Sequence, residues 1–537
     1  MISLLDRRPF LVVVLLTAYF ALQVALRMML PESLELDEGQ QIFLSQWLAA
    51  GYDDQPPFYN WVQYWTIALL GVSVFSLTLL KNGFLLASYL LFGLTAHGLL
   101  GDRRLTVIAA LGLITISQIS YEAQRDLTHT VAVIFAASLF LFGLFRTLRK
   151  PDASAYLLTG VAIGIGLISK YNFALLPASV LLAMLPDAEL RRRIFDWRIL
   201  LTAAAAILIV VPHGLWFVEH IDEATSRTVA KMTEDASPGK LQQIGEGLLS
   251  LAVVLVNLSA MTLVVFAAAF GKGLVIALRN GNDGWTRLIE RTWIVAILAV
   301  VGLVLFFGVA EIRNRWLIPL SLVLPLYLCL KLQAAGIAGT RQSFTRFVSI
   351  VLVIMVVVPT ILFVRIAAAG LTGDYQKLNV PYGPMVEQLI GQATIRLGLV
   401  IAGDRSLAGS IRLHAPDIAV MTPDYPQFSP PAPPGRPVLV VWRDRESGDS
   451  VPAMPEALAT LVAGKVPLAD ASGETLTLPY HYGAEGDVYS FSYRWIDVPG
   501  DAPAMPKGPA VTTTQRKSPG PSAKSSTAPS SSPPDAP

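Results

Sequence analysis

Two adjacent acidic residues follow the first apolar stretch of the sequence. Asp37 and Glu38 lie in the motif SLELDEGQ. A carboxylate in this position can act as a general base on an acceptor hydroxyl, or it can hold a divalent cation. Acids in the first turn of a helix also stabilise the helix by interacting with its dipole, without any role in chemistry. The pair alone therefore leaves catalysis, cation binding and helix capping open.

A second polar group lies further along the same connection, in the motif DDQPPFYNW. Its two prolines fix an extended turn, and aromatic residues follow the turn. In a functional interpretation, Gln55, Tyr59 and Trp61 form the floor of a cleft for a sugar or a lipid head group. In a structural interpretation, the same residues form a turn and an ordinary aromatic belt at a membrane interface.

The motif SYEAQRDLTHT brings several titratable side chains close together. Glu122, Asp126 and His129 are separated by four and then three residues, so on one continuous helix they share a face. Arg125 lies next to Asp126. Mutual neutralisation of the Arg, Asp and His side chains is one explanation of this group. The other is that Asp126 provides a second acidic group beside the first acidic pair.

Cations suited to phosphate binding stand in two further motifs. Lys170 lies in LISKYNF, where Tyr171 follows it as a substrate-cleft candidate, and Arg313 and Arg315 lie in EIRNRWLIPL. An ammonium is a compact charge for a phosphate, and a guanidinium binds phosphate through two parallel hydrogen bonds. Alternatively, the lysine extends to lipid head groups and the arginines anchor a helix end.

The composition identifies the elements that must position these residues. The 537 residues are 53% hydrophobic and 15% charged, with a mean hydropathy of +0.54. Soluble domains contain about 25% charged residues, so a polytopic membrane protein is indicated. The formal net charge of +2 gives no electrostatic reason to expect a nucleic-acid partner. The single cysteine, Cys329, excludes an intramolecular disulfide and cysteine-based metal clusters.

Apolar runs of nearly membrane-spanning length predict about eleven transmembrane helices. Basic residues fall in every second connection, so the positive-inside rule places those connections in the cytoplasm and the chain after residue 370 outside. The N-terminal run is too long for a signal peptide and is expected to stay uncleaved. The predicted spans are 10–27, 83–101, 105–121, 127–145, 156–169, 173–186, 199–217, 247–271, 292–310, 316–330 and 347–364.

The chain divides into three predicted regions. They are a transmembrane domain at 1–370 with a long first outer loop at 28–82, a small α/β domain at 371–497, and a disordered Pro/Ser/Ala-rich tail at 498–537. Within the loop, 39–50 is predicted to be an amphipathic helix that lies on the membrane surface and is capped by Asp37 or Glu38. In the α/β domain we expect strands at 397–403, 417–422 and 437–442, and a helix near 405–413.

This topology places the acids and the phosphate-binding candidates on the outer side. An acid that activates an acceptor hydroxyl, with cations that stabilise a departing phosphate, suits transfer from a lipid-linked phosphate donor. Nucleotides are not expected outside the cytoplasm, so we expect the donor to be a polyprenyl-phosphate sugar. The alternative from another class is a lipid or sugar transporter or flippase, which predicts an inverted repeat and charges through the bilayer midplane.

The order of these elements resembles a known family. A long outer loop with Asp-Glu and then a Pro-Pro-aromatic turn resembles the C-type (GT-C) fold glycosyltransferases, in particular the superfamily of protein O-mannosyltransferases and lipid A aminoarabinose transferases. The resemblance covers roughly 1–370. It implies an enzyme of the bacterial inner membrane that transfers a sugar, with inversion, from a polyprenyl-phosphate donor. The implied acceptor is lipid A, core oligosaccharide or a similar envelope glycan at the periplasmic face.

The resemblance also implies roles for individual residues. Asp37 matches the catalytic acid/base position, Glu38 is its neighbour, and Asp126 is the second-loop acid. Aminoarabinose transferases usually have Asp-Lys-Pro-Pro in the first loop, with the lysine on the donor phosphate, whereas this sequence has Gln55 in place of that lysine. We therefore expect other cations to hold the phosphate, namely Lys170, Arg313 and Arg315.

Four motifs narrow the resemblance further. Gln-Pro-Pro, SYEAQRDLTHT, SKYNF and RWLIPL are most similar to the rhizobial lipopolysaccharide galacturonosyltransferases. Whether a divalent cation joins Asp37 and Asp126 stays open, because members of the superfamily differ in this respect.

Overall fold

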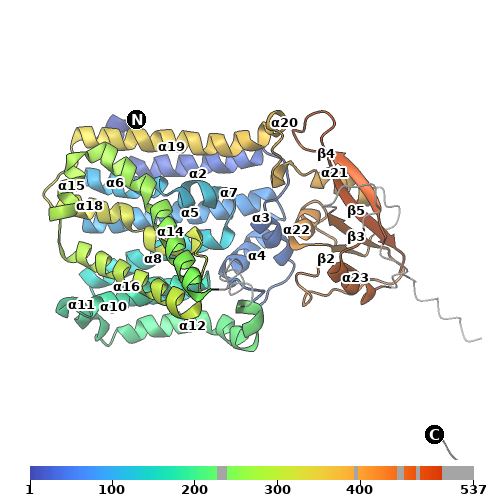
Figure 1. Cartoon of the computed structure of the whole chain (residues 1–537), viewed down its shortest axis with the longest axis horizontal. Helices are drawn as coiled ribbons and strands as arrows, with labels where there is room; N and C mark the ends of the chain where they lie inside the picture. The colour runs from blue at the N-terminus through green and yellow to red at the C-terminus, as the bar shows by residue number, and fades with distance from the viewer. Residues whose placement is uncertain (226–238, 392–396, 444–452, 467–471, 499–537) are drawn as a thin grey trace, which may run out of the picture.

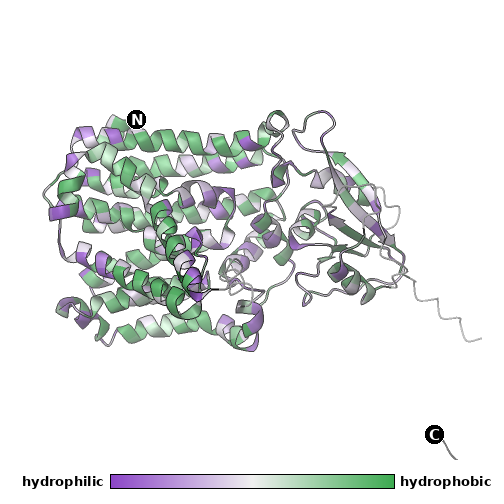
Figure 2. Cartoon of the chain, in the orientation of Figure 1, coloured by the Kyte–Doolittle hydropathy of each residue, from purple (hydrophilic) through white to green (hydrophobic). Residues whose placement is uncertain are grey.

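The protein consists of a helical bundle with a small α/β domain at one end (Figure 1). The computed structural model describes residues 1–225, 239–391, 397–443, 453–466 and 472–498. The predicted disordered tail therefore lies almost entirely outside the described residues. Hydrophobic residues predominate along the helices of the bundle, whereas hydrophilic residues are more frequent at its two ends, one of which meets the α/β domain (Figure 2).

Eight helices in the described part of the chain are long and apolar enough to cross a membrane. A bent pair of helices gives a ninth, and two shorter apolar helices occupy the other predicted positions, which accounts for the eleven expected segments. The eight are α2 (Leu11–Met28), α5 (Val74–Leu99), α8 (Thr128–Arg149), α12 (Ile199–Glu219), α14 (Lys240–Phe270), α16 (Gly284–Phe307), the pair α17 (Asn314–Ser321) and α18 (Leu324–Ala334), and α19 (Arg341–Ala367).

The two short apolar helices and the remaining connections complete the bundle. The short helices are α9 (Ala153–Leu167), and η3 (Tyr171–Ala174) with α10 (Leu175–Met184). The other helical pieces are α1 (Ile2–Arg7), α11 (Ala188–Ile194), α15 (Lys272–Asn280), α20 (Ala369–Thr372) and η4 (Lys377–Asn379). Of the 18 most apolar consecutive residues, 78% are buried in α8 and 28% in α19. Helix α8 therefore lies in the centre of the bundle and α19 at its lipid-facing edge.

The bent pair contains the first half of the second acidic motif. It joins α6 (Arg103–Gly112) and η1 (Leu113–Thr115) to η2 (Gln118–Glu122) and α7 (Ala123–Arg125), with a bend of 67°. The helix then stops at Asp126, and Leu127 adopts a left-handed conformation with φ of 70°. The prediction that Glu122, Asp126 and His129 share one helical face is therefore wrong. Asp126 and Leu127 separate α7 from α8, so Glu122 and His129 lie on different helices.

The first outer loop contains two helices, α3 (Leu36–Leu44) and α4 (Phe58–Leu70). Helix α3 begins earlier and ends earlier than predicted, and its N-cap is Glu35 rather than Asp37 or Glu38. It does not lie open on a membrane surface, because residues 38–44 are all buried. Helix α22 (Arg405–His414) of the α/β domain packs against α3.

The close approach of α3 and α22 depends on glycine. A Cβ atom added to Gly409 would stand 1.8 Å from the carbonyl oxygen of Gly39, and a Cβ atom on Gly39 would stand 2.9 Å from the carbonyl oxygen of Ser406. Only residues without side chains allow the two backbones to come this near. The α/β domain therefore rests directly on the helix that contains Asp37.

The α/β domain is built on a five-stranded sheet with the strand order β2-β1-β3-β5-β4. Strands β2, β1 and β3 are parallel, and β5 and β4 are added antiparallel. The predicted strands and helix of this domain are confirmed. The strands are β1 (Leu399–Ala402), β2 (Val420–Met421), β3 (Val438–Arg443), β4 (Glu474–Pro479) and β5 (Val488–Ile496).

The two faces of this sheet bury different clusters, as the alternation of side chains along a strand requires. Leu399 and Ile401 face the cluster that includes α23 (Glu456–Ala463). Val400 and Ala402 face the cluster formed by α21 (Tyr382–Ile390), α22 and α3. The first outer loop therefore contributes to the hydrophobic core of the α/β domain.

Candidate active site

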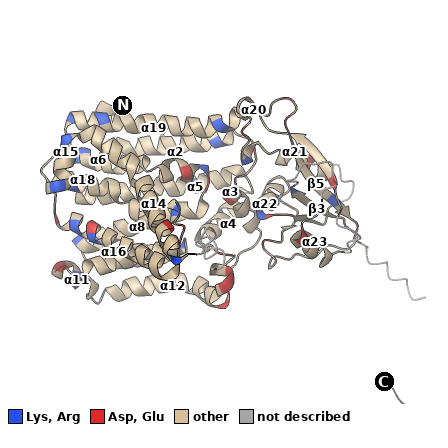
Figure 3. Ribbon diagram, in the orientation of Figure 1, with Lys and Arg blue, Asp and Glu red and all other residues tan. Residues whose placement is uncertain are grey.

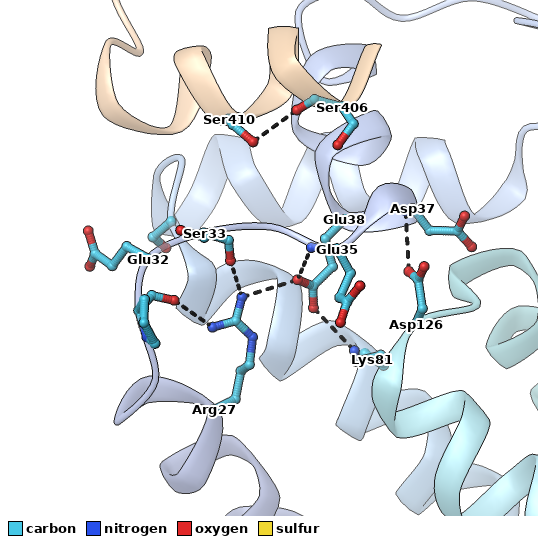
Figure 4. Close-up of polar contacts among 12 residues, drawn as sticks. Arg27, Glu32, Ser33, Glu35, Asp37, Glu38, Lys81, Asp126, Ser406 and Ser410 are labelled. Carbon is cyan, nitrogen blue, oxygen red and sulfur yellow. Dashed lines mark hydrogen bonds and ion pairs between the residues drawn. The ribbon is translucent and has the colours of Figure 1, made fainter. Parts of the chain in front are cut away.

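Asp37 and Asp126 meet where α3 and α8 begin (Figure 4). The backbone N–H of Asp37 donates to Oδ1 of Asp126 at 3.2 Å. In return, Oδ2 of Asp37 accepts from the backbone N–H of Thr128 at 3.2 Å. Both carboxylates are half-buried and lie at helix N-termini, where negative charge is favourable. The two acids predicted to act together are thus adjacent, although 89 residues separate them in the sequence.

The surroundings of Asp126 favour its protonated form. Burial raises the pKa of Asp126 well above its ordinary value, and the neighbouring charges of Asp37, Glu35 and Glu38 raise it further. Lys81 acts in the opposite direction but does not outweigh them. Two nearby carboxyl groups of this kind can hold one proton between them, which is suited to acid–base chemistry near neutral pH.

Glu38 faces away from Asp37, toward two cations (Figure 4). Its carboxylate accepts from Arg27 at 3.1 Å and from Lys81 at 3.2 Å, and the residue is only 2% exposed. It also accepts from the backbone N–H of Glu35, which closes a capping box at the start of α3. Burial raises the pKa of Glu38, but the charges of Arg27 and Lys81 outweigh burial and lower it to about 2. Glu38 is a permanently charged clamp between α2, α3 and α5.

The sequence analysis missed Lys81. It placed the second span at 83–101, but α5 begins at Val74, so Lys81 lies inside the helix and is 3% exposed. The available signal was a lysine within the apolar run SLTLLKNGFLLA, because an ionisable residue in a membrane helix is a functional hypothesis by default. Its ammonium also donates to the carbonyl oxygen of Gln124 at 3.0 Å, two residues before Asp126.

The other charged residues of the second acidic motif lie apart from Asp126. Arg125 pairs with Glu122 at 3.5 Å, and both side chains are more than one third exposed. His129 is buried, with Nε2 lying 3.4 Å from Nε2 of Gln41. The proposed neutralisation among Arg, Asp and His is therefore not the arrangement found, because Arg125 uses Glu122 instead.

Lys170 lies beside the first turn of α8. Its ammonium donates to Oγ1 of Thr130 at 2.9 Å, so it is joined to the helix that begins next to Asp126. The turn that contains Lys170 contacts the Gln-Pro-Pro segment, since the backbone N–H of Phe58 donates to the carbonyl oxygen of Ile168 at 2.9 Å. Gln55 is half-buried in this segment, and its backbone N–H donates to Oδ1 of Asp53 at 3.1 Å. Lys170 therefore lies on a turn that contacts the segment of Gln55, the residue that stands where the resemblance led us to expect a lysine.

The turn that contains Lys170 also contacts the start of α17. Nδ2 of Asn172 donates to the carbonyl oxygen of Trp316 at 2.6 Å. Arg315 precedes Trp316, and its half-buried guanidinium has no ion pair or hydrogen bond among the residues that the structure describes. Arg313, in contrast, pairs with Glu311 at 3.0 Å. Lys170 and Arg315 are therefore the better placed of the three predicted phosphate ligands.

The two aromatic residues of the predicted cleft floor lie in different surroundings. Tyr59 is 1% exposed, and burial raises its pKa. Its ring packs near Phe84 and His129. Trp61 is half-buried, and its Nε1 donates to the carbonyl oxygen of Ala49 at 2.7 Å, which ties α4 to the preceding segment. Their role in a substrate cleft stays a prediction.

Tyr171 contributes to an aromatic stack at the outer end of α12. Its hydroxyl lies 3.0 Å from Nε2 of His213, and the two rings are stacked. Nδ1 of His213 is 2.9 Å from the carbonyl oxygen of Ala50, so the stack connects α12 to the first outer loop. Tyr171 therefore supports the turn next to Lys170.

The α/β domain adds a buried polar network to the loop. Asp53 accepts from Nε2 of Gln40 at 3.0 Å, from Nη1 of Arg405 at 3.4 Å and from the hydroxyl of Tyr425. Burial and the charge of Asp54 raise the pKa of Asp53, although Tyr425 and Arg405 oppose them. No local sequence signal links Asp53 to Arg405 and Tyr425, because these two partners lie more than 350 residues away.

An apolar groove runs along the bundle on the side of α17. It has a volume of about 740 Å³ and is lined by α14, α16 and the α17–α18 segment. Its lining includes Leu317, two residues after Arg315, together with Trp293 and Leu320. The groove therefore extends from the neighbourhood of Arg315 into the apolar part of the bundle.

Comparisons with known proteins place this fold and site in a family. Residues 54–216 match the family profile described as dolichyl-phosphate-mannose-protein mannosyltransferase. The lipopolysaccharide core galacturonosyltransferase RgtB of Rhizobium johnstonii is 46% identical over 486 residues, which cover 90% of this chain and 97% of that protein. RgtA of the same organism is 44% identical over 489 residues, covering 90% of this chain and 96% of that protein.

The solved structures show the same fold. The crystal structure of ArnT from Cupriavidus metallidurans bound to undecaprenyl phosphate matches with a TM-score of 0.57 at 15% identity, over 90% of this chain and 97% of that chain. The expected GT-C fold is thus confirmed. The chain belongs to the family of polytopic membrane glycosyltransferases that includes the rhizobial galacturonosyltransferases. The protein is an enzyme, and the transporter hypothesis is set aside.

Proposed function

We propose that this enzyme transfers galacturonic acid from a polyprenyl-phosphate donor to a lipopolysaccharide core acceptor at the periplasmic face of the inner membrane. The sugar and the acceptor are proposed from the two relatives above, which are lipopolysaccharide core galacturonosyltransferases. The lipid donor is proposed from the ArnT structure, which contains undecaprenyl phosphate. The observation that carries the proposal is the Asp37–Asp126 pair beside Lys170.

The carboxylate pair provides the acid–base step. Asp37 takes the proton of the acceptor hydroxyl as the oxygen attacks the anomeric carbon of the donor sugar, and the bond from that carbon to the phosphate oxygen breaks. Attack from the face opposite the phosphate inverts the anomeric carbon. Asp126 holds the backbone of Asp37 in place and shares the negative charge of the pair.

The cations stabilise the departing group. The polyprenyl phosphate leaves with its negative charge near the ammonium of Lys170 and the guanidinium of Arg315, in a site where such charges act more strongly than in water. Gln55 cannot supply this charge, and Lys170 lies on the turn that contacts the Gln-Pro-Pro segment. The apolar groove beside α17 offers a surface for the first part of the polyprenyl chain.

The proposed orientation follows from the distribution of charge. Lys and Arg side chains gather at the end of the bundle far from the α/β domain (Figure 3). By the positive-inside rule that end is cytoplasmic. The α/β domain and the active site are then periplasmic, where a lipid-linked donor and an envelope acceptor are both present.

A divalent cation would have two protein ligands in this site. In the described part of the chain there is no group of three or more His, Cys, Asp or Glu residues arranged to hold a metal ion. Asp37 and Asp126 would bind Mg²⁺ only if water and phosphate oxygens completed its six ligands, as they do in many phosphate-handling enzymes. Dialysis against EDTA decides whether transfer uses such a cation. A loss of activity that Mg²⁺ restores would assign the cation to Asp37 and Asp126, and a rate that stays within about twofold would exclude it.

The proposed function is tested with purified enzyme, undecaprenyl-phosphate galacturonic acid and lipopolysaccharide core. We expect transfer of the sugar together with release of undecaprenyl phosphate. Asp37→Asn should lower kcat by about 100- to 10,000-fold, which is the usual contribution of a general base. Donor that is consumed without any glycosylated acceptor, or transfer that is undiminished in Asp37→Asn, would contradict the mechanism.

The phosphate assignment has its own test. Lys170→Ala and Arg315→Ala should each raise the donor KM by about tenfold or more, because each removes a charge-assisted hydrogen bond. Arg192→Ala, an exposed cation on α11, is the matched control and should change nothing. Equal donor KM values in all three variants would remove Lys170 and Arg315 from the site.

A further inference from the structure

A second cavity opens on the other side of the carboxylate pair, between α2, α5, α7 and α19. Its enclosed space is small, about 50 Å³, so it can take a compact charged group but not a whole sugar. Four cations line it, namely Arg27, Lys81, Arg125 and Arg365, together with the single acid Glu35. Much of the remaining wall is apolar and comes from α2 and α19.

We propose that this cavity binds an anionic group of the membrane-anchored acceptor, either a carboxylate or a phosphate, next to the hydroxyl that receives the sugar. This inference rests on the proposed function, because it assigns the acceptor to one side of the site and the donor to the other. Nothing in the family comparisons assigns a role to these cations.

The four cations of the cavity take part in ion pairs that differ in burial. Glu38 engages both Arg27 and Lys81, Glu35 pairs with Arg365 at 3.2 Å, and Glu122 pairs with Arg125 at 3.5 Å. Within these pairs four cations are matched by three acids, because Glu38 serves two of them. Burial also raises the pKa of Glu35, so this acid is a weak competitor for Arg365.

Arg125 is the most available of the four cations. Its side chain is 43% exposed, and its pair with Glu122 joins two exposed side chains, an arrangement that contributes little free energy. A guanidinium in this position can bind a carboxylate or a phosphate through two parallel hydrogen bonds. A neutral sugar would not need such a site.

The position of the cavity fits an acceptor. Arg125 directly precedes Asp126, and Lys81 contacts Gln124, so the cavity borders the carboxylate pair. Lys170 reaches the same pair from α8, through Thr130. Helices α2 and α19 form one edge of the bundle and α12 lies at the opposite edge (Figure 1). Two membrane-bound substrates could therefore reach Asp37 from opposite sides.

The apolar wall suits the lipid part of the acceptor. Leu26 and Leu30 of α2 and Leu362 and Phe363 of α19 line the cavity beside its charged part. An amphiphile could place its acidic group among the arginines and its acyl chains against these helices. The enclosed space has room only for the anionic group itself, and the rest of the acceptor would extend outside the cavity.

The test compares Arg125→Gln with the wild type in detergent, using two acceptors. One is native lipopolysaccharide core, and the other is the same material with carboxyl groups methylated and phosphates removed. We expect Arg125→Gln to raise the acceptor KM by about tenfold, with kcat and donor KM unchanged. With the wild type, the neutralised acceptor should have a KM about tenfold higher than the native acceptor. With Arg125→Gln, the two acceptors should have the same KM. Arg192→Gln should behave as the wild type.

A second measurement separates this inference from the proposed function. Binding of each acceptor to the full-length protein is measured directly by native mass spectrometry, without any donor. If the wild type transfers no sugar but still prefers the anionic acceptor through Arg125, the proposed function fails while the binding site stands. Equal binding of both acceptors, or an Arg125→Gln variant with an altered donor KM only, would overturn the inference. If phosphatidylglycerol displaced the anionic acceptor as well as the acceptor itself does, the cavity would be a site for bulk anionic lipid, and the inference would be overturned as well.

Discussion

Neighbouring acids on α3 should respond to substitution in opposite ways. Asp37 faces the site and Asp126, whereas Glu38 is enclosed by Arg27 and Lys81. Amide substitution of each acid removes one negative charge and changes the shape of the side chain very little. We expect Asp37→Asn to lose turnover with its stability retained, and Glu38→Gln to lose stability first.

The size of the stability effect follows from the ion pairs of Glu38. A pKa lowered from 4.5 to about 2 corresponds to about 3 kcal/mol of stability at neutral pH. The sign is that of a depressed acid: the contribution is complete above pH 4.5 and is lost as the pH falls toward 2. Removing one partner of a buried pair typically destabilises by about 3–5 kcal/mol, because the other charge stays uncompensated. The two approaches agree.

The effect of Asp37→Asn on stability should be small. The carbonyl oxygen of asparagine can still accept from the backbone N–H of Thr128, so the start of α8 keeps its side-chain partner. We expect a change of less than about 1 kcal/mol, as for exchanges among good capping residues. Turnover should fall by about 100- to 10,000-fold, since a carboxamide cannot take the proton.

The assay measures thermal unfolding and kcat per folded molecule for both variants in the same detergent. A third variant, Lys81→Met combined with Glu38→Gln, should be more stable than Glu38→Gln alone, because it removes the orphaned charge together with its partner. The reasoning is refuted if Glu38→Gln unfolds at the wild-type temperature while turnover is abolished. It is equally refuted if Asp37→Asn is the less stable of the two single variants.

Two further predictions concern Asp126 and the contact between α22 and α3. Because burial and the charge of Asp37 raise the pKa of Asp126, the acidic limb of kcat/KM should lie well above pH 3.8, and Asp126→Asn should shift that limb to lower pH. A raised pKa means that the fold disfavours the charged acid, so Asp126→Asn should also raise the unfolding temperature at neutral pH. Near pH 3 the acid is already protonated, and the substitution should bring no gain. A lower unfolding temperature at both pH values would contradict this expectation. Gly409→Ala should separate α22 from α3, since its Cβ atom would stand 1.8 Å from the oxygen of Gly39, and overpacking of this kind destabilises by about 1–3 kcal/mol. Gly245→Ala is the control, because nothing lies within 4 Å of its added Cβ atom, and equal unfolding temperatures for the two variants would remove α22 as a support of α3.

The membrane helices could be predicted from the sequence because their signal is local. Each is a run of apolar residues long enough for the bilayer, and every predicted span coincides with helical structure. The exception in detail is the start of α5, where Lys81 and Asn82 interrupt the run. Both side chains find partners inside the protein, namely Glu38 for the lysine and Thr78 and Gln124 for the asparagine. Glu38 and Gln124 come from other helices, so hydropathy could not include the two residues in the span.

The geometry of the site depends on features that have no local signal. Leu127 is left-handed although leucine rarely adopts that conformation, and neither Gly nor Pro marks the position. The apparent helical spacing of Glu122, Asp126 and His129 was therefore misleading. Strain of this kind is held only where the surroundings determine it, and here the hydrogen bonds between Asp37, Asp126 and Thr128 do so.

Helix α3 shows a second limit of sequence patterns. An amphipathic pattern predicts that one face is covered but not what covers it. The sequence analysis assigned the membrane surface as the partner, whereas the structure places α22 there, through Gly39 and Gly409. The consequence for function is larger than a shifted helix boundary, because the same helix contains Asp37.

The α/β domain thereby becomes part of the catalytic geometry. On the side of the bundle, α3 is fixed by the ion pairs of Glu38 with Arg27 and Lys81. On its other side, α22 of the α/β domain packs against it. The loop after α3 is held by the same domain, since Tyr425 and Arg405 both contact Asp53. A catalytic carboxylate must stay within a fraction of an ångström of its productive position, and a membrane helix alone does not fix an outer loop so closely. The α/β domain, which contacts both α3 and the loop after it, supplies this restraint for Asp37, the proposed general base.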